Sequence, residues 1–294
     1  MTSFVAAAPF VLIAVLLSAA DSIAQKPARA SNPGREGPAI AIEKVNKRPT
    51  GKSSAQAISW YEGLLRKEPA NAVVLNNLGA LYFTAGRFYE AQSLIRRAAQ
   101  NARDSAQIHI NLAVAYNKSL NPGLAISTLE GVLQKDPSDA RALAFLCDIY
   151  SEQDQDREAV ECYERFMRSQ KLDAVSATNF GTVLLDLGEI KRALEVMQEA
   201  DGRFPNDPGL KNGIGIALYH RKKFTEAEKY LARAVELRPK EALIRYNLAL
   251  LQVVTKKRGA ALEQYRYLKT ADPELAGALY KALFRDKLVF VDPK

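Results

Sequence analysis

Six alanines stand at an unbroken spacing of 34 residues, and this spacing constrains the fold more than any other feature of the chain. They are Ala91, Ala125, Ala159, Ala193, Ala227 and Ala261. A fixed period of this length is typical of one supersecondary unit stacked many times, because a single unit cannot bury its hydrophobic face alone. The spacing therefore predicts a solenoid and not a globular enzyme.

Other positions keep the same period and indicate a helical hairpin in each unit. A small residue stands twelve positions before each alanine: Gly79, Ala113, Cys147, Gly181, Gly215 and Ala249. An apolar residue follows each alanine by four positions: Ile95, Leu129, Tyr163, Met197, Leu231 and Tyr265. Apolar residues three and four apart predict an apolar stripe on each of two helices, and small residues let the two backbones approach closely. Gly86 and Gly188 fall in the predicted turns, and Pro137, Pro205, Pro239 and Pro273 end second helices.

These residues resemble the signature of the tetratricopeptide repeat family. Leu75, Leu78, Gly79, Tyr82, Ala91, Ile95 and Ala98 carry it in the first unit, and Leu112, Ala113, Tyr116, Ala125, Leu129 and Pro137 in the second. The resemblance implies an all-α, right-handed α-solenoid of stacked antiparallel helix hairpins. Its six units are 72–105, 106–139, 140–173, 174–207, 208–241 and 242–275.

Departures from the family pattern are local. His109, Lys211 and Arg245 replace a bulky apolar residue early in the first helix of their units. In the third unit, Phe166 replaces a small residue and Lys171 replaces proline. We expect looser packing there and the same fold.

Both ends of the repeat array carry partial units. Ala57, Tyr61, Leu64 and Pro69 keep the phase of the repeats, so residues 53–71 are expected to form a degenerate half repeat. Leu275, Leu279 and Leu283 form an apolar stripe within residues 274–294, which predicts a capping helix followed by a short apolar tail, 289–291. The tail is expected to fold back onto this helix, and a docking strand is the alternative. A cap of this kind covers the exposed stripe of the last hairpin.

The first 24 residues indicate export. An apolar run extends from Phe4 to Ala20 and is followed by small residues at Ser22 and Ala24, as in a cleaved secretory signal peptide. The alternative is a single N-terminal membrane anchor, because the run is near the lower limit of the ~17–25 residues that span a bilayer. Residues 25–52 are rich in Pro, Gly, Ser and Lys and are interpreted as a flexible basic linker. We expect an exported protein, periplasmic in a bacterium or secreted.

Candidate residues for catalysis or metal binding are few. The two histidines, His109 and His220, lie in different units, and neither a Cys-x-x-Cys nor a Gly-x-Ser-x-Gly motif is present. We therefore expect no enzyme, no metal, no cofactor and no small-molecule substrate. An exported protein could join Cys147 to Cys162. In the resembling family, however, the site of Cys147 packs against the alanine corresponding to Ala159, so two unpaired thiols are expected.

The resemblance also implies a binding groove. In this family the first helices of the repeats line a concave groove in which peptides lie. The candidate groove residues are Asn76, Asn77, Asn111, Asn117, Asp148, Asn179, Asn212, Tyr219, Tyr246 and Asn247. An amide both donates and accepts, so a row of asparagines can hold an extended peptide backbone. The alternative, that these amides satisfy neighbouring groups or face water, has equal weight. A clamp for a carboxy-terminal carboxylate is not expected, because Asn76, Ala80 and Ile110 replace its cations.

Charge is uneven along the predicted turns, and the whole chain carries a formal net charge of +8. The third unit has Asp148, Glu152, Asp154, Asp156 and Glu158 near its turn. The fifth and sixth units have a basic edge, made of Arg221, Lys222, Lys223, Lys256, Lys257 and Arg258. Because such turns emerge on one edge of a solenoid, this edge is predicted to run from acidic to basic and could steer an acidic partner or an anionic surface. Solubilising charge is the alternative interpretation.

The leading hypothesis is an exported, non-catalytic scaffold that binds protein segments in its groove, in bacterial cell-envelope assembly. The alternative is salt-sensitive binding of an anionic surface or polyanion through the basic linker and the basic turns. The export signal and the Gly and Ala packing sites argue against a nucleic-acid partner.

Overall fold

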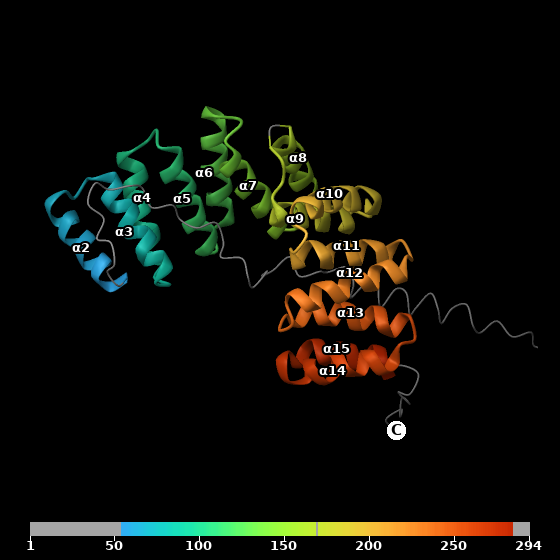
Figure 1. The fold of residues 1–294 in the computed structure, drawn as a ribbon. Helices are drawn as coiled ribbons and strands as arrows, with labels where there is room; N and C mark the ends of the chain where they lie inside the picture. Colours follow the sequence, from blue (N-terminus) through green and yellow to red (C-terminus); the bar gives the residue numbers. More distant parts are fainter. Residues whose placement is uncertain (1–53, 169, 285–294) are drawn as a thin grey trace, which may run out of the picture. The chain divides into compact units, whose positions relative to one another are not determined.

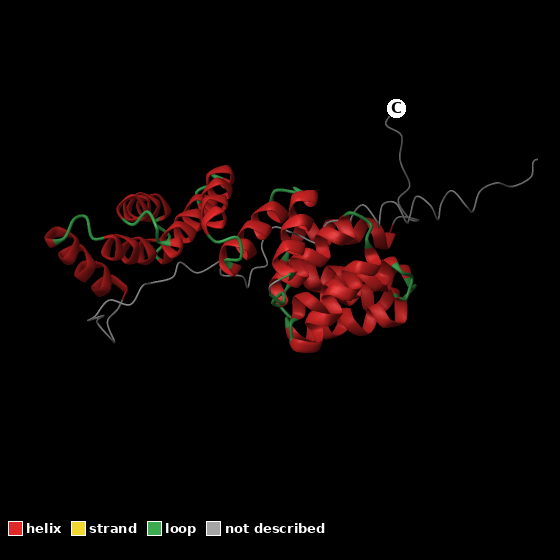
Figure 2. Ribbon diagram, turned by 90° about the horizontal axis from the view of Figure 1, so that it is seen from above, coloured by secondary structure: helices red, strands yellow, loops and turns green. Residues whose placement is uncertain are grey.

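The computed structural model describes residues 54–168 and 170–284, and these residues form helices and turns without any strand (Figure 2). The predicted signal or anchor segment (1–24), the linker (25–52) and the apolar tail (289–291) lie outside the described residues. No helix in the described ranges is long and apolar enough to cross a membrane.

The chain divides into two compact units between Lys171 and Leu172. This division falls at the end of the third repeat, where Phe166 and Lys171 depart from the family pattern. The N-terminal unit contains α2 (Ser54–Lys67), α3 (Ala72–Thr84), α4 (Phe88–Asn101), α5 (Ala106–Lys118), α6 (Pro122–Lys135), α7 (Ala140–Glu152) and α8 (Asp156–Met167). The C-terminal unit contains α9 (Ala174–Asp186), α10 (Ile190–Arg203), α11 (Pro208–His220), α12 (Phe224–Leu237), α13 (Ala242–Val254), α14 (Arg258–Ala271) and α15 (Pro273–Phe284).

Each unit is a stack of antiparallel helix hairpins (Figure 1). We call the first helix of each hairpin the A helix and the second the B helix. Neighbouring A helices contact each other, α3 with α5 and α5 with α7 in one unit, α9 with α11 and α11 with α13 in the other. Each B helix packs on its own A helix, and α4, α6, α10 and α12 also pack on the A helix of the next hairpin. Over its described residues, each unit is therefore an all-α solenoid.

Side-chain caps start five of the six A helices that the structure describes, and a left-handed residue follows each of the six. The side chains of Asn71, Ser105, Asp139, Asp173 and Asp207 accept hydrogen bonds from backbone N–H groups in the first helical turn. Each A–B turn contains one residue with positive φ, at the same repeat position: Gly86, Leu120, Asp154, Gly188, Lys222 and Lys256. Glycine adopts this conformation without steric cost, whereas the four side chains are held in it by the turn.

The small residue on each A helix permits close contact with its B helix, as predicted. A Cβ atom built on Gly79 would lie 2.5 Å from Cγ1 of Ile95 and 3.2 Å from the carbonyl oxygen of Ala91. On Gly215 it would lie 2.6 Å from Cγ of Leu231 and 3.3 Å from the carbonyl oxygen of Ala227. All six periodic alanines are fully buried. The 34-residue spacing thus marks the points where the two backbones of each hairpin meet.

The expectation of two unpaired thiols is wrong. Cys147 on α7 and Cys162 on α8 form a disulfide, with Cα atoms 5.3 Å apart. Cys162 lies one helical turn after Ala159 and shares its face of α8. The thiol at the small position on α7 therefore reaches Cys162 as well as Ala159, and the bond links the two helices of the third hairpin.

The last helix closes the C-terminal unit. Leu279 and Leu283 of α15 are buried together with Tyr246, Ala249 and Leu268, and Leu275 packs against this cluster partly buried. The helix runs from Pro273 to Phe284 within the described range. It covers the apolar stripe of the sixth hairpin.

Polar side chains at the departures from the family pattern have partners. The Lys211 ammonium lies 2.7 Å from the carboxylate of Asp201 on α10. The Arg245 guanidinium donates to Oε1 of Gln264 at 2.8 Å and lies 4.2 Å above the ring of Tyr267. These pairs provide partners for polar side chains at positions where the family pattern has a bulky apolar residue.

Candidate functional site

The candidate groove residues of the N-terminal unit include a buried chain of amides that links its A helices. Nδ2 of Asn111 donates to Oδ1 of Asn76 at 2.8 Å, and Nδ2 of Asn76 donates to Oδ1 of Asn77 at 3.2 Å. Nδ2 of Asn77 donates to the hydroxyl of Tyr61 on α2 at 3.3 Å. All three asparagines are 0% exposed. The bonds satisfy amides whose burial without partners would be costly.

This chain of amides continues to the next A helix. Gln107 donates to Oδ1 of Asn111 at 2.9 Å, and Arg141 at the start of α7 donates to Oε1 of Gln107. The half-buried Asn117 donates to the carboxylate of Glu152 at 3.1 Å. Polar side chains thus connect α2, α3, α5 and α7.

Asp148, predicted both in the groove and near the acidic turn, is buried inside α7. Its side chain accepts a hydrogen bond from the hydroxyl of Tyr163 at 3.0 Å, and the residue is 2% exposed. The structure therefore gives Asp148 an intramolecular role between the A and B helices of the third hairpin.

The C-terminal unit repeats the link between A helices. Nδ2 of Asn247 on α13 donates to Oδ1 of Asn212 on α11 at 2.9 Å. Asn179, Asn212 and Tyr219 are half-buried, so part of each side chain is accessible. Tyr246 is 2% exposed, and its hydroxyl has no hydrogen-bond partner among the described residues. This burial raises the pKa of Tyr246 to about 12.

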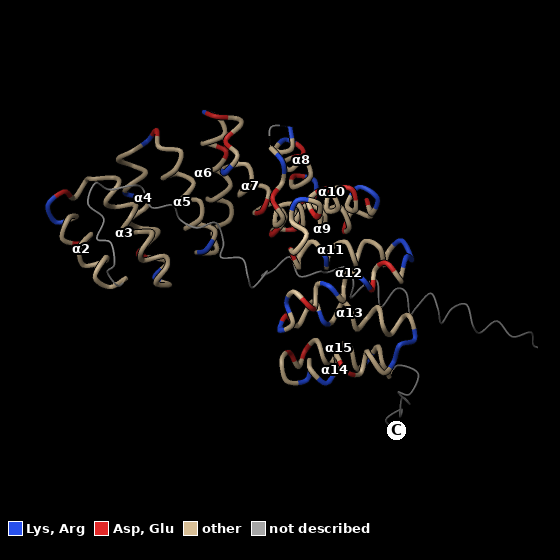
Figure 3. Tube along the Cα trace, viewed as in Figure 1, with Lys and Arg blue, Asp and Glu red and all other residues tan. Residues whose placement is uncertain are grey.

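The predicted basic edge lies on two turns of the C-terminal unit. Figure 3 shows the α11–α12 and α13–α14 turns emerging on the same side of this unit, each carrying Lys or Arg. Lys223 pairs with Glu226 at 3.0 Å and Lys257 with Glu228 at 2.6 Å. Arg221, Lys222 and Lys256 are exposed and form no ion pair with described residues. The acidic turn lies in the other unit, between α7 and α8, so the gradient along one edge stays a prediction.

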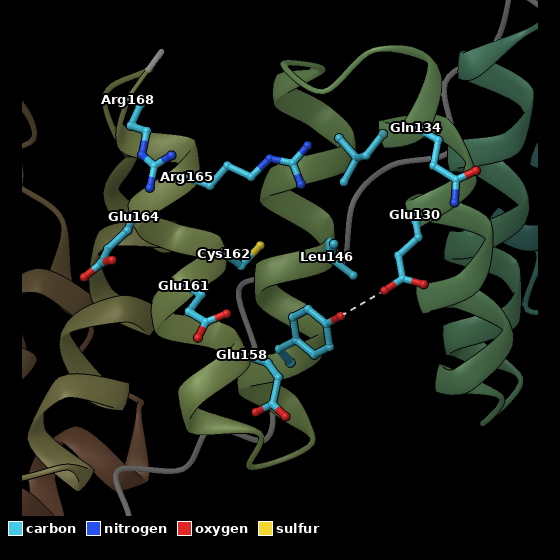
Figure 4. A pocket seen from close by; sticks show the side chains of 11 residues that line it. Glu130, Gln134, Leu146, Glu158, Glu161, Cys162, Glu164, Arg165 and Arg168 are labelled. Carbon is cyan, nitrogen blue, oxygen red and sulfur yellow. Dashed lines mark hydrogen bonds between the residues drawn. The ribbon is translucent and has the colours of Figure 1, made fainter.

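Two cavities in the N-terminal unit were not singled out by the sequence analysis. The larger, about 760 Å³, lies over α6, α7 and α8; its walls include Leu133, Leu146 and Cys162, and its rim carries carboxylates (Figure 4). The smaller, about 550 Å³, lies over α2, α3 and α4.

Each cavity holds a tyrosine–glutamate pair. The hydroxyl of Tyr82 donates to Oε1 of Glu62 at 2.6 Å, and that of Tyr150 donates to Oε1 of Glu130 at 3.4 Å. The hydrogen bond to Glu62, followed by burial, raises the pKa of Tyr82. Burial, followed by the charge of Glu130, raises the pKa of Tyr150. The sequence signal that could have identified both cavities is the recurrence of this Tyr–Glu pair after 68 residues, two repeat periods.

No group of three or more His, Cys, Asp or Glu side chains in the described ranges is placed to hold a metal ion.

Stacked helix hairpins with a polar layer along the A helices define a helical-repeat protein, the class to which α-solenoids belong. The sequence profile of the tetratricopeptide repeat matches residues 76–140, 178–242 and 212–276, and the chain belongs to the tetratricopeptide repeat family. Its architecture is that of a protein-interaction scaffold.

Curated relatives share part of this chain at low identity. The human protein O-mannosyl-transferase TMTC1 is 24% identical over 208 residues, 69% of this chain and 24% of the relative. The type IV pilus assembly protein PilF of Pseudomonas aeruginosa is 24% identical over 55% of this chain and 66% of the relative. The peroxisomal targeting signal receptor of Komagataella phaffii is 25% identical over 56% of this chain and 29% of the relative. The chain thus spans about a quarter to two thirds of these relatives.

Solved structures share the fold. The structure of PilF from Pseudomonas aeruginosa superposes with a TM-score of 0.63 at 21% identity, covering 80% of this chain and all of that one. Cut9, in its complex with Hcn1, gives a TM-score of 0.67 at 16% identity over 79% of this chain and 46% of that one. YrrB, described as having an unusual peptide-binding site, gives 0.51 at 24% identity over 64% of this chain and 97% of that one.

Proposed function

We propose that this protein is an exported, non-catalytic scaffold that binds an extended segment of a partner protein along its A helices, in cell-envelope assembly. The observation that carries the proposal is the link between side-chain amides of successive A helices, Asn76 with Asn111 and Asn212 with Asn247. In the C-terminal unit the half-buried Asn179 and Asn212 can offer polar groups to a peptide backbone, and Tyr219 can offer the accessible part of its ring. The buried N-terminal amides would instead fix the helices that shape the surface.

Export is supported by two independent features. Residues 4–20 form an apolar run of the signal-peptide type. Cys147 and Cys162 form a disulfide, and disulfides persist in oxidising compartments and are rare in a reducing cytosol. PilF, a pilus assembly protein, is among the relatives with the same fold. A bacterial periplasmic location fits these features.

The test is affinity capture from a cell-envelope extract with the full 294-residue chain as bait. The variant bait carries Asn212→Ala and Tyr219→Ala, which remove two half-buried side chains of α11, and the matched control carries Lys222→Ala on the neighbouring turn. Circular dichroism verifies that all three baits are equally helical. A partner retained at moderate salt by the chain and the control, and lost by the variant, supports groove binding. A partner retained equally by all three baits contradicts it.

A second function rests on the exposed cations Arg221, Lys222 and Lys256 on one side of the C-terminal unit. Neighbouring basic turns add their fields, so this side is suited to an anionic surface. Sedimentation with phosphatidylglycerol vesicles is expected to bind the chain at low salt and release it at high salt. Replacing the three cations by Gln should abolish this binding, while Asn212→Ala should leave it unchanged. Binding that is insensitive to salt would exclude this function.

A further inference from the structure

The two cavities of the N-terminal unit occupy equivalent positions in two hairpins, and they share the Glu, Leu and Tyr side chains at their centre. Adding 68 to the residue numbers of the smaller cavity gives residues of the larger one: Glu62 becomes Glu130, Leu78 becomes Leu146, Tyr82 becomes Tyr150 and Glu90 becomes Glu158. The other lining positions of the smaller cavity correspond in the same way, except Arg87. The residue 68 positions after Arg87 is Gln155, which does not line the larger cavity.

Arg87 places a cation on the wall of the smaller cavity. Its guanidinium carbon lies 3.9 Å from the ring centroid of Tyr82, and its Nε lies 2.9 Å from Oε1 of Glu90. The aromatic face and the carboxylate attract the same positive charge. This charge-assisted hydrogen bond raises the pKa of Arg87.

The larger cavity keeps the groups that hold this cation but has no arginine at that position. Glu130 and Glu158 form no ion pair with described residues, and Tyr150 has no cation over its ring among them. Arg165 and Arg168 lie at the end of the cavity opposite Glu158 (Figure 4), and Arg165 donates to the carbonyl oxygen of Pro137 at 2.8 Å. Four glutamates and two arginines line the cavity, so its lining is net acidic.

We propose that the cavity over α6, α7 and α8 is a second interaction surface, which binds an arginine side chain from a partner protein. The guanidinium would stack on Tyr150 and pair with Glu158, in the place that Arg87 takes in the smaller cavity. Leu133 and Leu146 would receive the aliphatic part of the arginine or a neighbouring apolar side chain. A volume of about 760 Å³ leaves room for both. This surface is separate from the proposed groove and does not depend on it.

The smaller cavity suggests the decisive variant, Gln155→Arg. Gln155 precedes α8 with φ −86° and ψ 70°, and Arg87 precedes α4 with φ −87° and ψ 66°. An arginine placed at position 155 therefore starts from the same backbone conformation, and its guanidinium should occupy the place over Tyr150 and beside Glu158. Gln153→Arg is the matched control, because it adds the same charge to the same exposed turn outside the cavity lining.

The experiment is a titration of the full chain, followed by the NMR signals of its backbone amides. The probe is the peptide acetyl-Ala-Ala-Arg-Ala-Ala-amide, and its control contains citrulline, a neutral analogue of arginine, at the central position. We expect the arginine peptide to shift the amides around Tyr150 and Glu158, and the citrulline peptide to bind at least about tenfold more weakly. Gln155→Arg should abolish the shifts, and Gln153→Arg should preserve them.

Several results would overturn the proposal. These are equal binding of the two peptides, unchanged binding by Gln155→Arg, or no shift at the cavity at any peptide concentration. A further one concerns the arginines of the chain itself. If replacing Arg29, Arg35 and Arg48 by Gln shifts the same amides and the peptide does not, the site serves an intramolecular contact and not a separate partner.

Discussion

At the scale of single residues, the side chains with the clearest sequence signal are held by other parts of the same chain. The asparagines that recur near the small positions were expected either to bind a peptide or to satisfy neighbouring groups. In the N-terminal unit, Asn76, Asn77 and Asn111 are buried and hydrogen-bond one another. Replacing Asn111 would leave Asn76 and Gln107 without this hydrogen-bond partner and should lower the stability of the N-terminal unit. A loss of binding in such a variant would therefore not identify Asn111 as a contact of the partner.

Tyr246 predicts a dependence of stability on alkaline pH. Because its pKa is raised to about 12 by burial, the folded chain keeps the phenol proton at a pH where the unfolded chain loses it, near 10. The unfolded state then binds fewer protons, so this residue lowers the free energy of unfolding as pH rises from about 10 to 12, by about 1–3 kcal/mol in total. Urea unfolding of the chain and of Tyr246→Phe over this pH range measures the difference.

The difference in the free energy of unfolding between the chain and Tyr246→Phe should increase with pH only above about pH 10, where Tyr246→Phe is the more stable protein. Below that pH the variant should be equal or slightly more stable, because the hydroxyl it removes is buried without a hydrogen-bond partner among the described residues. A constant difference in the free energy of unfolding up to pH 12 would contradict the raised pKa of Tyr246.

At the scale of the helical hairpin, the contact at the small residue sets the distance between the A and B helices. Gly215→Ala is expected to lower the free energy of unfolding by about 1–2 kcal/mol, because the new methyl group would overlap Leu231 and approach the backbone of Ala227. Gly131→Ala is the matched control. Nothing lies within 4 Å of a Cβ atom there, so the higher helix propensity of alanine should raise the free energy of unfolding by about 1 kcal/mol.

Denaturant unfolding of both variants checks the pair. Equal stabilisation by the two substitutions would mean that the hairpin can widen at Gly215 without cost.

The turn between α5 and α6 stores backbone strain. Leu120 has φ 58° and is 88% exposed, so its side chain gains little from packing while its Cβ crowds the backbone. Leu120→Gly is expected to raise the free energy of unfolding by about 0.5–1 kcal/mol, after the greater freedom of glycine in the unfolded chain is subtracted. Leu120→Ala keeps a Cβ at the same φ and should not stabilise. If both variants are equally stabilised, exposure of the leucine and not its backbone is the cause.

The same scale shows what a sequence can predict in this fold. The 34-residue period placed the hairpins and the small contact points, because each position of a repeat meets the same neighbours in every unit. It did not predict the Cys147–Cys162 bond, because position 162 has no constant residue type from repeat to repeat. The cavities were missed for a related reason. Each is built from three successive helices, and the hydrogen bond of Tyr150 to Glu130 of the preceding hairpin can be found only when both hairpins are considered together.

At the scale of the whole molecule, the division between Lys171 and Leu172 predicts that local changes in stability stay within one unit. Replacing Cys147 and Cys162 together by Ala opens a crosslink with a sequence separation of 15 residues, at an expected cost of about 3 kcal/mol. Alanine is the residue found at the small position in two other repeats, at Ala113 and Ala249, so the substitution at position 147 keeps a residue type that this contact accepts.

Hydrogen exchange followed by mass spectrometry should locate this loss. We expect faster exchange in α5–α8 and unchanged exchange in α11–α15, and a reducing agent should affect only the unmodified chain. Faster exchange throughout both units would show that they unfold as one cooperative body.

The disulfide of the third hairpin has a consequence for following the protein in a cell. A chain that has not left a reducing cytosol carries two thiols at Cys147 and Cys162, and a chain that has reached an oxidising compartment carries none. The redox state of these two cysteines therefore distinguishes the two populations. It can be measured by alkylating the free thiols at lysis and quantifying the peptides that contain them by mass spectrometry. Under the proposed export, the ratio of alkylated to disulfide-bonded peptide would measure the exported fraction without a reporter fused to the chain.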